Sequence, residues 1–166
     1  VEFGIDFKEP FATPFKERVR RCSPAEELAK IKEVKKMEGA GVIRHSKSPW
    51  ASNVVMVKKK DGTWRFCCDW RRLNQLIKKD SFPLPRIDDS LEKLGKAKRF
   101  TTCDIDSAFW NIPCKESDCQ YTAFNTPLGL MEYTRMGFGL CNSSAVFQRS
   151  MQQALGDLTE EMCLLY

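Results

Sequence analysis

Two aspartates stand at the end of an apolar run, Thr101-Thr102-Cys103-Asp104-Ile105-Asp106, whose residue types are typical of a β-strand. Side chains two residues apart lie on the same face of a strand, so Asp104 and Asp106 can point the same way if the strand continues. If the strand ends between them, Asp106 caps a helical turn at Ser107 instead, and this second interpretation is favoured. Asp104 directly follows the run and is the better candidate ligand for a hard cation such as Mg²⁺. A site for two cations needs further carboxylates.

A second group of candidates is cationic. Two strand-like runs, 54–57 and 64–68, flank Lys58-Lys59-Lys60-Asp61-Gly62-Thr63, where Asp-Gly is a favoured hairpin turn because both residues tolerate positive φ. Further cations and aromatic rings follow in alternation: Trp64, Arg65, Phe66, Trp70, Arg71 and Arg72. Cations mixed with flat rings are suited to a polyphosphate or a nucleic acid strand.

The charge of the chain is divided along its length. Residues 1–79 hold 19 Lys or Arg against 10 Asp or Glu, and residues 80–166 hold 8 against 12, within a net charge of +5. A basic half can bind a polyanion beside an acidic half that binds cations. Charge alone favours the simpler interpretation that Lys and Arg solvate surface helices. The motifs must therefore decide between polyanion binding and an ordinary charged surface.

Composition limits the class of protein. With 166 residues and 42% apolar content, one domain with one core is expected. The eight cysteines show no repeating spacing, which favours reduced thiols, and Cys114, Cys119 and His45 form no zinc pattern. No run is long enough for a membrane span and no signal peptide is visible. We expect a cytoplasmic protein with no membrane partner, with the nucleus or a virus-like particle as alternative locations.

The remaining elements follow from local signals. Residues 1–22 are predicted to form an extended arm, and Ser23, Pro24 and Glu26 predict the start of a helix with a stripe at Leu28, Ile31, Val34 and Met37. After a stiff break at 82–85, the chain predicts a helix over 87–94, a strand over 99–105 and a hairpin of 120–125 with 130–135. A helix capped by Asn142 or Ser143 and ended by Gly156 follows, and then a strand that begins at Met162. The class is α+β, with the last strand beside the one that carries Asp104.

These residues resemble the reverse transcriptase domain of long-terminal-repeat retrotransposons of the Ty3/gypsy type. The matching runs keep the order of the family from about residue 24 to residue 166, which a lone short motif does not achieve by chance. They are residues 48–52, 57–74, 82–85, 100–105, 122–124, 136–142 and 145–148.

The resemblance implies a right-hand polymerase with fingers over about 23–99 and 111–140, and a palm from about 100. The palm would have a ferredoxin-like βαββαβ order that is incomplete at the C-terminus. In the family, the residues matching Lys59 and Arg65 bind the triphosphate of the incoming deoxynucleotide. Phe109 matches the ring that excludes a 2′-hydroxyl, and Phe138 and Gly139 match the turn that supports the nucleotide.

The resemblance also implies RNA-directed DNA polymerase activity with two Mg²⁺ ions, on an RNA or DNA template with its primer, within a longer Pol polyprotein. Asp104 matches the first catalytic aspartate and metal ligand, and the Ile105 carbonyl matches a second metal ligand. Trp64, Arg71 and Asn74 are expected to contact template or primer. The other two aspartates of the family lie in a Tyr-x-Asp-Asp turn whose tyrosine matches Tyr166. We therefore expect a fragment that is inactive alone.

Gly137 and Ser144 stand where the family usually has proline, so a looser turn is expected before the second long helix. Two other functions stay open. One is a non-catalytic nucleic-acid-binding remnant of a retroelement. The other is a glycosyltransferase that uses Asp104-Ile105-Asp106 as a metal motif, which predicts a parallel sheet of alternating strands and helices before the motif.

Overall fold

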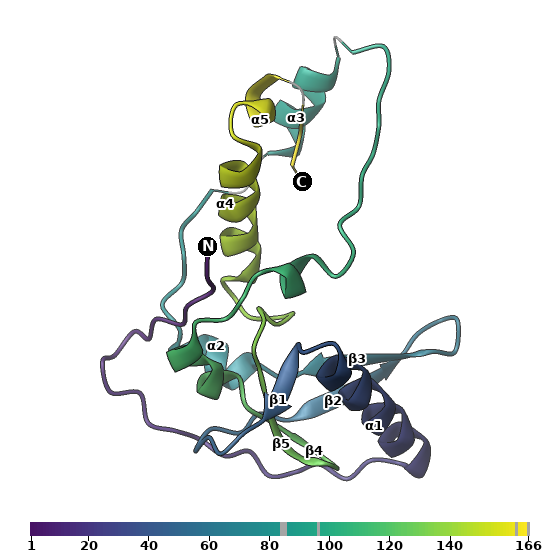
Figure 1. The fold of residues 1–166 in the computed structure, drawn as a ribbon, viewed down its shortest axis with the longest axis vertical. Coiled ribbons are helices and arrows are strands. Elements are labelled where there is room, and N and C mark those ends of the chain that lie inside the picture. Colours follow the sequence, from purple (N-terminus) through teal and green to yellow (C-terminus); the bar gives the residue numbers. More distant parts are fainter. Residues whose placement is uncertain (84–85, 96, 162, 166) are drawn as a thin grey trace.

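The computed structural model describes residues 1–83, 86–95, 97–161 and 163–165, with both sheets in one body and three helices projecting from it (Figure 1). The body contains α1 (Pro24–Gly39), β1 (Ile43–His45), β2 (Val54–Lys58), β3 (Trp64–Cys68), α2 (Arg71–Leu76), the 3-10 helices η1 (Ala108–Asn111) and η2 (Glu116–Thr122), β4 (Phe124–Thr126) and β5 (Gly129–Tyr133). The projecting part contains α4 (Ser143–Leu155), with α3 (Ile87–Leu94) and α5 (Leu158–Glu161) at its far end. The predicted α+β class is confirmed.

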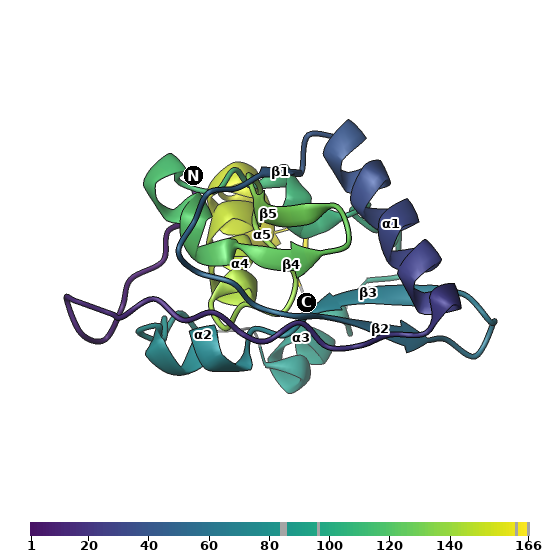
Figure 2. The same ribbon diagram turned by 90° about the horizontal axis from the view of Figure 1, so that it is seen from below.

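Two small antiparallel sheets build the body. One has the order β1-β5-β4, and the other pairs β2 with β3 from Val54 opposite Cys68 to Lys58 opposite Trp64. A bridge between Ser52 and Phe124 links the chain before β2 to β4. The figures show α1 along one side of the sheets and α2 at the other end of the body (Figure 2). Both predicted hairpins are therefore present.

One apolar core joins the two sheets. Its largest fully buried side chains come from the arm, from α2 and its flanks, from β4 and β5 and from the loop after β5: Phe3, Trp70, Leu73, Ile77, Phe124, Met131 and Met136. The β2–β3 sheet adds the buried Val54 and Met56. Contact between large apolar side chains removes their surface from water, and this is the main favourable contribution to folding. Trp70 is part of this core, although the sequence analysis grouped it with the rings and cations suited to binding a polyphosphate or a nucleic acid strand.

Helix α1 begins as its residue types predict. Ser23 and Glu26 form a reciprocal capping box, in which the Ser23 Oγ accepts from the Glu26 backbone and Glu26 accepts from the Ser23 N–H. Val34 and Met37 are buried as predicted, but Leu28 is 69% exposed. Lys30 is buried instead, and its Nζ donates to the Val54 carbonyl at 3.4 Å. The predicted stripe thus faces the core at Val34 and Met37 but not at Leu28.

The arm of residues 1–22 packs along the body in an extended form. Isolated bridges pair Phe3 with Cys114, Phe7 with Ile77 and Lys16 with Ala51, and Phe3 and Phe15 are buried. Backbone hydrogen bonds from partners far along the chain satisfy polar groups that an isolated arm would expose to water. The arm is therefore an integral part of the body.

Three sequence predictions about strands need correction. Residues 99–105 form no strand, and the chain after α3 returns to η1 as an irregular segment (Figure 1). Residues 116–122 form η2, so β4 starts only at Phe124. Residues 163–165 form no strand, and residues 162 and 166 of that prediction lie outside the described residues, as do residues 84 and 85 of the break. A strand needs a hydrogen-bonded neighbour, and within the described residues neither segment meets one.

Helices α3 and α4 match their predicted boundaries, whereas α5 was not predicted. Gly95 follows α3, and Gly156 follows α4 with a φ of 52°. Ile87 and Leu91 of α3 are exposed, whereas Leu94 is partly buried, so most of the apolar stripe of this helix lies in solvent among the described residues. No helix in the described part of the chain is long and apolar enough to cross a membrane.

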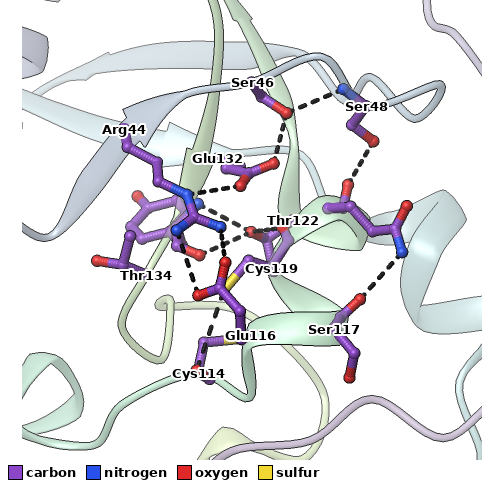
Figure 3. A network of polar contacts seen from close by, with 12 residues as sticks. Arg44, Ser46, Ser48, Cys114, Glu116, Ser117, Cys119, Thr122, Glu132 and Thr134 are labelled. Atoms are coloured by element: carbon purple, nitrogen blue, oxygen red, sulfur yellow. Dashed lines mark hydrogen bonds and ion pairs between the residues drawn. The ribbon is translucent and has the colours of Figure 1, made fainter.

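A polar network ties β1 to β5 and η2 (Figure 3). The Arg44 Nε donates to Glu132 at 2.8 Å, and both Arg44 amino groups donate to Glu116. Hydrogen bonds to Glu116 and Glu132 raise the pKa of the Arg44 guanidinium above its ordinary value. The Ser46 Oγ also donates to Glu132, whose side chain is only 9% exposed. The network thus satisfies a nearly buried carboxylate at the centre of a strand.

This geometry predicts unequal roles for the two glutamates. We expect Glu132→Gln to lower the free energy of unfolding by about 1.5–3 kcal/mol, because a buried acceptor of two hydrogen bonds is altered. Glu116→Gln removes the same charge from an exposed position and should cost clearly less. Urea unfolding of both variants measures the difference, and equal losses would contradict the assigned role of Glu132.

Candidate functional site

A cavity of about 540 Å³, here named the hairpin cavity, lies against the β2–β3 hairpin. Its walls come from α1, β3, η1, β5 and the turn at 136–142. They are Glu33, Lys36, Met37, Lys59, Trp64, Arg65, Phe66, Cys67, Cys68, Trp110, Tyr133, Phe138 and Gly139. The volume is in the range of small-molecule sites, and cations and aromatic rings share the lining.

Five predicted site residues meet in this cavity. Lys59, Trp64 and Arg65 come from the hairpin, and Phe138 and Gly139 come from the turn at 136–142. The hairpin residues and the turn residues are far apart in the sequence, and only the packing of the hairpin against the turn brings the two groups together. Lys59 and Arg65 are exposed, and within the described residues neither forms an ion pair. Their charges therefore remain available to an anionic ligand.

Local hydrogen bonds shape the hairpin tip. The Asp61 Oδ1 accepts from the backbone N–H of Thr63 at 2.9 Å and from its hydroxyl at 2.6 Å. These bonds hold the pKa of Asp61 below its ordinary value. Gly62 has a φ of 81°, which the Asp-Gly turn predicts. The lysines beside this turn thus stand on an ordered support.

The turn at 136–142 is fixed by three side chains. The carbonyl of Gly137 accepts from the Ser143 Oγ, that of Phe138 from the Trp70 Nε1, and that of Gly139 from the Asn74 Nδ2, each at 2.9 Å. Asn74 also accepts from the Cys141 N–H at 2.9 Å. Consecutive peptide groups are therefore tied to α2 and α4.

Gly137 and Ser144 replace the prolines that are usual in the resembling family, and a hydrogen bond next to them restrains the turn in another way. Ser143, the neighbour of Ser144, is 1% exposed and forms its hydrogen bond inside the protein. A buried hydrogen bond restricts the backbone of Gly137 in the folded state, as a proline ring does in all states. This hydrogen bond opposes the expected looseness of the turn, which stays a prediction.

Aromatic rings continue from the turn to η1. The ring centroid of Phe109 lies 4.9 Å from that of Phe138 and 5.7 Å from that of Phe147. Phe138 is 48% exposed, since its carbonyl rather than its ring faces the core. Trp110 lines the hairpin cavity, and its buried Nε1 has no hydrogen-bond partner among the described residues. Phe109 thus reaches the cavity through its contact with Phe138.

Arg71 and Asn74 lie on α2, next to the same turn. Arg71 forms an ion pair with Asp69 at 2.6 Å, and its hydrogen bond is the main reason that the pKa of Asp69 is lowered. The Asn74 side chain uses both its amide nitrogen and its amide oxygen in hydrogen bonds to the turn. Neither side chain borders the hairpin cavity, so their expected contacts with a strand would be made on the outer side of the turn.

Asp104 and Ile105 are exposed and do not line the hairpin cavity. Asp104 lies in the irregular segment before η1 rather than at the end of a strand. The predicted helical turn is present as the 3-10 helix η1, but its N-cap is Ser107, with a left-handed φ of 49° and no side-chain cap bond within the described part of the chain. The Asp106 carboxylate accepts only from the Ser107 hydroxyl there, at 3.2 Å, so its predicted role as the cap is wrong. The described residues contain no group of three or more side chains suited to a metal ion. Tyr166 lies outside the described residues.

Sequence reasoning missed several cavity residues. Trp110 and Tyr133 bring an indole and a phenol, and Glu33 and Lys36 bring charges from α1. The signal for Glu33 and Lys36 was their position beside the buried Val34 and Met37, because residues that flank a buried stripe border the groove next to it. No local pattern in the sequence indicates that the groove beside α1 is the hairpin cavity.

The strand pairing argues against the glycosyltransferase alternative. All the ladders between named strands in the described residues are antiparallel. A nucleotide-sugar enzyme of the kind considered needs a parallel sheet that alternates with helices before its metal motif. The described residues before Asp104 contain a hairpin and no such sheet.

Comparisons with known proteins agree with the sequence pattern. Residues 57–166 match the sequence profile of the family described as reverse transcriptase (RNA-dependent DNA polymerase). The Pol polyprotein of transposon 297 from Drosophila melanogaster is 40% identical over 139 residues, 81% of this chain and 13% of the relative. The Tf2-3 polyprotein of Schizosaccharomyces pombe is 34% identical over 167 residues, 100% of this chain and 12% of the relative. The chain thus spans about an eighth of these relatives.

Solved structures show the same fold. A crystal structure of prototype foamy virus protease-reverse transcriptase superposes with a TM-score of 0.81 at 23% identity, over 93% of this chain and 21% of the viral one. The foamy viral enzyme in complex with an RNA/DNA hybrid gives a TM-score of 0.75 at 22% identity, over 90% of this chain and 20% of that one. The likeness supports the predicted polymerase fold.

The turn geometry gives a prediction with an internal control. A Cβ on Gly139, where φ is 87°, would lie 3.2 Å from the Trp70 Cδ1, whereas a Cβ on Gly62, where φ is 81°, would meet nothing within 4 Å. Gly62→Ala should cost about 1 kcal/mol from its backbone conformation. Gly139→Ala should cost more and change the fluorescence of Trp70. Urea unfolding with tryptophan emission measures both, and equal effects would show that Trp70 does not confine the turn.

Proposed function

Since the chain belongs to the reverse transcriptase (RNA-dependent DNA polymerase) family, we propose that it is the fingers and part of the palm of an RNA-directed DNA polymerase within a retrotransposon Pol polyprotein. The observation that carries this proposal is the hairpin cavity, where Lys59 and Arg65 face the turn of Phe138 and Gly139. The substrates are a deoxynucleoside triphosphate and a primer on an RNA or DNA template.

The two cations fit a triphosphate by their chemistry. Arg65 offers a planar fork that can bind two phosphate oxygens, and Lys59 is a point charge on a flexible stem. Both are exposed and unpaired among the described residues, so binding requires no internal ion pair to break. A polyphosphate held here would lie beside the aromatic rings of the cavity, which suit the base and sugar.

Phe109 is proposed to select the sugar. Its ring packs on Phe138, whose backbone is held by Trp70, so a chain of contacts fixes the ring from the core outwards. A fixed ring under the sugar leaves no room for a 2′-hydroxyl, because interiors are close-packed and overlap is costly. Discrimination would then depend on volume rather than on a hydrogen bond.

Asp104 and Ile105 are proposed to hold Mg²⁺ through a carboxylate and a carbonyl. Magnesium is commonly bound by one or two carboxylates together with substrate phosphates, so two protein oxygens fit a site that is shared with the substrate. When bound, the ions would stabilise the attacking and leaving oxygens of the reaction. The described residues bring no three acidic, histidine or cysteine side chains together, so a site for two ions needs further ligands.

The proposed reaction is nucleotidyl transfer. The 3′-oxygen of the primer attacks the α-phosphate, the new P–O bond forms, and the bond to pyrophosphate breaks. Lys59 and Arg65 bind the β- and γ-phosphates, where charge collects on the leaving group. The turn at Gly139 and the ring of Phe109 hold the nucleotide in line with the primer.

The function is tested by primer extension on an RNA template with Mg²⁺. A polypeptide that contains these residues and continues through a Tyr-x-Asp-Asp turn should extend the primer, and residues 1–166 alone should not. In the longer form, Lys59→Ala or Arg65→Ala should raise KM for the nucleotide about tenfold or more, because each removes a charge-assisted contact.

Lys32→Ala is the matched control, since Lys32 is exposed on α1 and does not line the hairpin cavity. It should leave KM unchanged. If the longer polypeptide binds nucleic acid in a strongly salt-dependent way but extends no primer, the protein is the non-catalytic remnant instead.

The proposed role of Phe109 in sugar selection gives a separate prediction. Phe109→Val in the longer form should admit ribonucleotides, because the smaller side chain opens the space beneath the sugar. Phe109→Tyr keeps the ring and should keep the discrimination. The ratio of kcat/KM for a deoxynucleotide to that for its ribonucleotide measures the effect, and an unchanged ratio in the valine variant would refute the role of Phe109.

A further inference from the structure

A second cavity of about 370 Å³ lies between the N-terminal arm and α2, away from the hairpin cavity. We name it the arm cavity. It is lined by Lys8, Glu9, Phe11, Ala12, Thr13, Phe15, Arg72, Gln75 and Leu76. It shares no lining residue with the hairpin cavity, and the resemblance assigns no role to the part that the arm contributes.

The arm is anchored on both sides of this cavity. On one side, the Lys8 N–H donates to the Leu76 carbonyl at 2.9 Å and the Lys78 N–H donates to the Asp6 carbonyl at 2.7 Å. On the other side, the Ala51 N–H donates to the Phe15 carbonyl at 2.9 Å. Residues 9–14 therefore form a loop between two fixed points, and the cavity is a built feature of the fold.

The cavity combines an exposed ring with two cations. Phe11 is 91% exposed, whereas Phe15 is 4% exposed and lies under the Arg72 guanidinium, 4.5 Å from its ring centroid. A guanidinium stacked on a ring keeps its N–H donors in its own plane, where they can bind a phosphate. The Lys8 Nζ donates to the Gln75 carbonyl at 2.7 Å, which places its charge at the cavity.

This lining favours a nucleotide over a simple anion. Glu9 also borders the cavity, and its carboxylate opposes a bare anion in the interior. The neutral base of a nucleotide can stack on Phe11 without being repelled by the Glu9 carboxylate. The phosphate of the same nucleotide can then lie beside Lys8 and Arg72. Base stacking on exposed rings combined with a cationic path is how single strands are bound without sequence preference.

The arm cavity continues the proposed path of the template. Asn74 and Arg71 stand on α2 next to the turn of Gly139, and Arg72 and Gln75 of the same helix line the arm cavity. A helix of six residues is about 9 Å long. A strand that leaves the turn and crosses α2 thus reaches Phe11 within a short distance.

We infer that the arm cavity binds an unpaired template nucleotide, with Phe11 stacking on the base and with Lys8 and Arg72 contacting its phosphate. The inference rests on the proposed function, because it takes the strand on α2 to be the template. It extends the template contacts beyond those expected for Trp64, Arg71 and Asn74.

The test uses the longer, polymerase-competent polypeptide and a fluorescent primer–template with either one or eight unpaired template nucleotides. Phe11→Ala should weaken binding of the long overhang about tenfold, the range of a lost base stack, and leave the short overhang unchanged. Lys8→Gln should weaken the long overhang and reduce the salt dependence of its binding. Val19→Ala and Lys16→Gln are the controls, because both residues are exposed on the same arm and outside the cavity.

A second measurement needs no substitution. An overhang that carries 5-iodouracil at each position in turn should photo-crosslink to the peptide of residues 8–15 from one or two positions. Binding of the long overhang by Phe11→Ala as tightly as by the wild type, or crosslinking only elsewhere, overturns the inference while wild-type extension still stands. If the wild type extends no primer, the proposed function fails, and an overhang-dependent effect of Phe11→Ala would then assign the cavity to a binding remnant.

Discussion

The hydrogen bonds from Ser143, Trp70 and Asn74 to the carbonyls of Gly137, Phe138 and Gly139 are the constraint on which the candidate site depends. They fix three consecutive peptide groups from two different helices. Because the backbone of Phe138 is bound inwards, its ring points outwards to Phe109. Without these bonds, the hairpin cavity would lose one wall, and α2 would lose its link to α4.

The site divides into a rigid side and an exposed side. The turn at 136–142 is held by the core, with Trp70 only 2% exposed. The hairpin tip is held by local bonds within residues 59–63, and its lysines are exposed to solvent. Local opening costs least where few buried contacts exist, so the hairpin is the part suited to close on a ligand. The turn is the part suited to define where that ligand lies.

Sequence reasoning succeeded where the physical cause was local. The capping box at Ser23, the Asp-Gly turn at Gly62 and the glycines after α3 and α4 all act through neighbours in the chain. It failed where the cause was distant. The run before Asp104 has strand-like residues, but a strand needs a partner and the described residues supply none. Trp70 looked like a surface ring because only the fold shows that its indole nitrogen meets the Phe138 carbonyl. The meeting of Lys59 with Gly139 followed from the resemblance, and no spacing indicated it.

The wall of the hairpin cavity has a consequence for redox chemistry. The Cys68 sulfur lies 3.8 Å from the Tyr133 hydroxyl, and burial raises the pKa of the Cys68 thiol well above its ordinary value. Alkylating and oxidising agents attack the thiolate, which is scarce at such a sulfur. Peroxide should therefore spare Cys68 and modify solvent-facing thiols such as Cys22 and Cys103 first. Under oxidative stress, lesions would then collect on the periphery of the protein before they reach the contact between Cys68 and Tyr133.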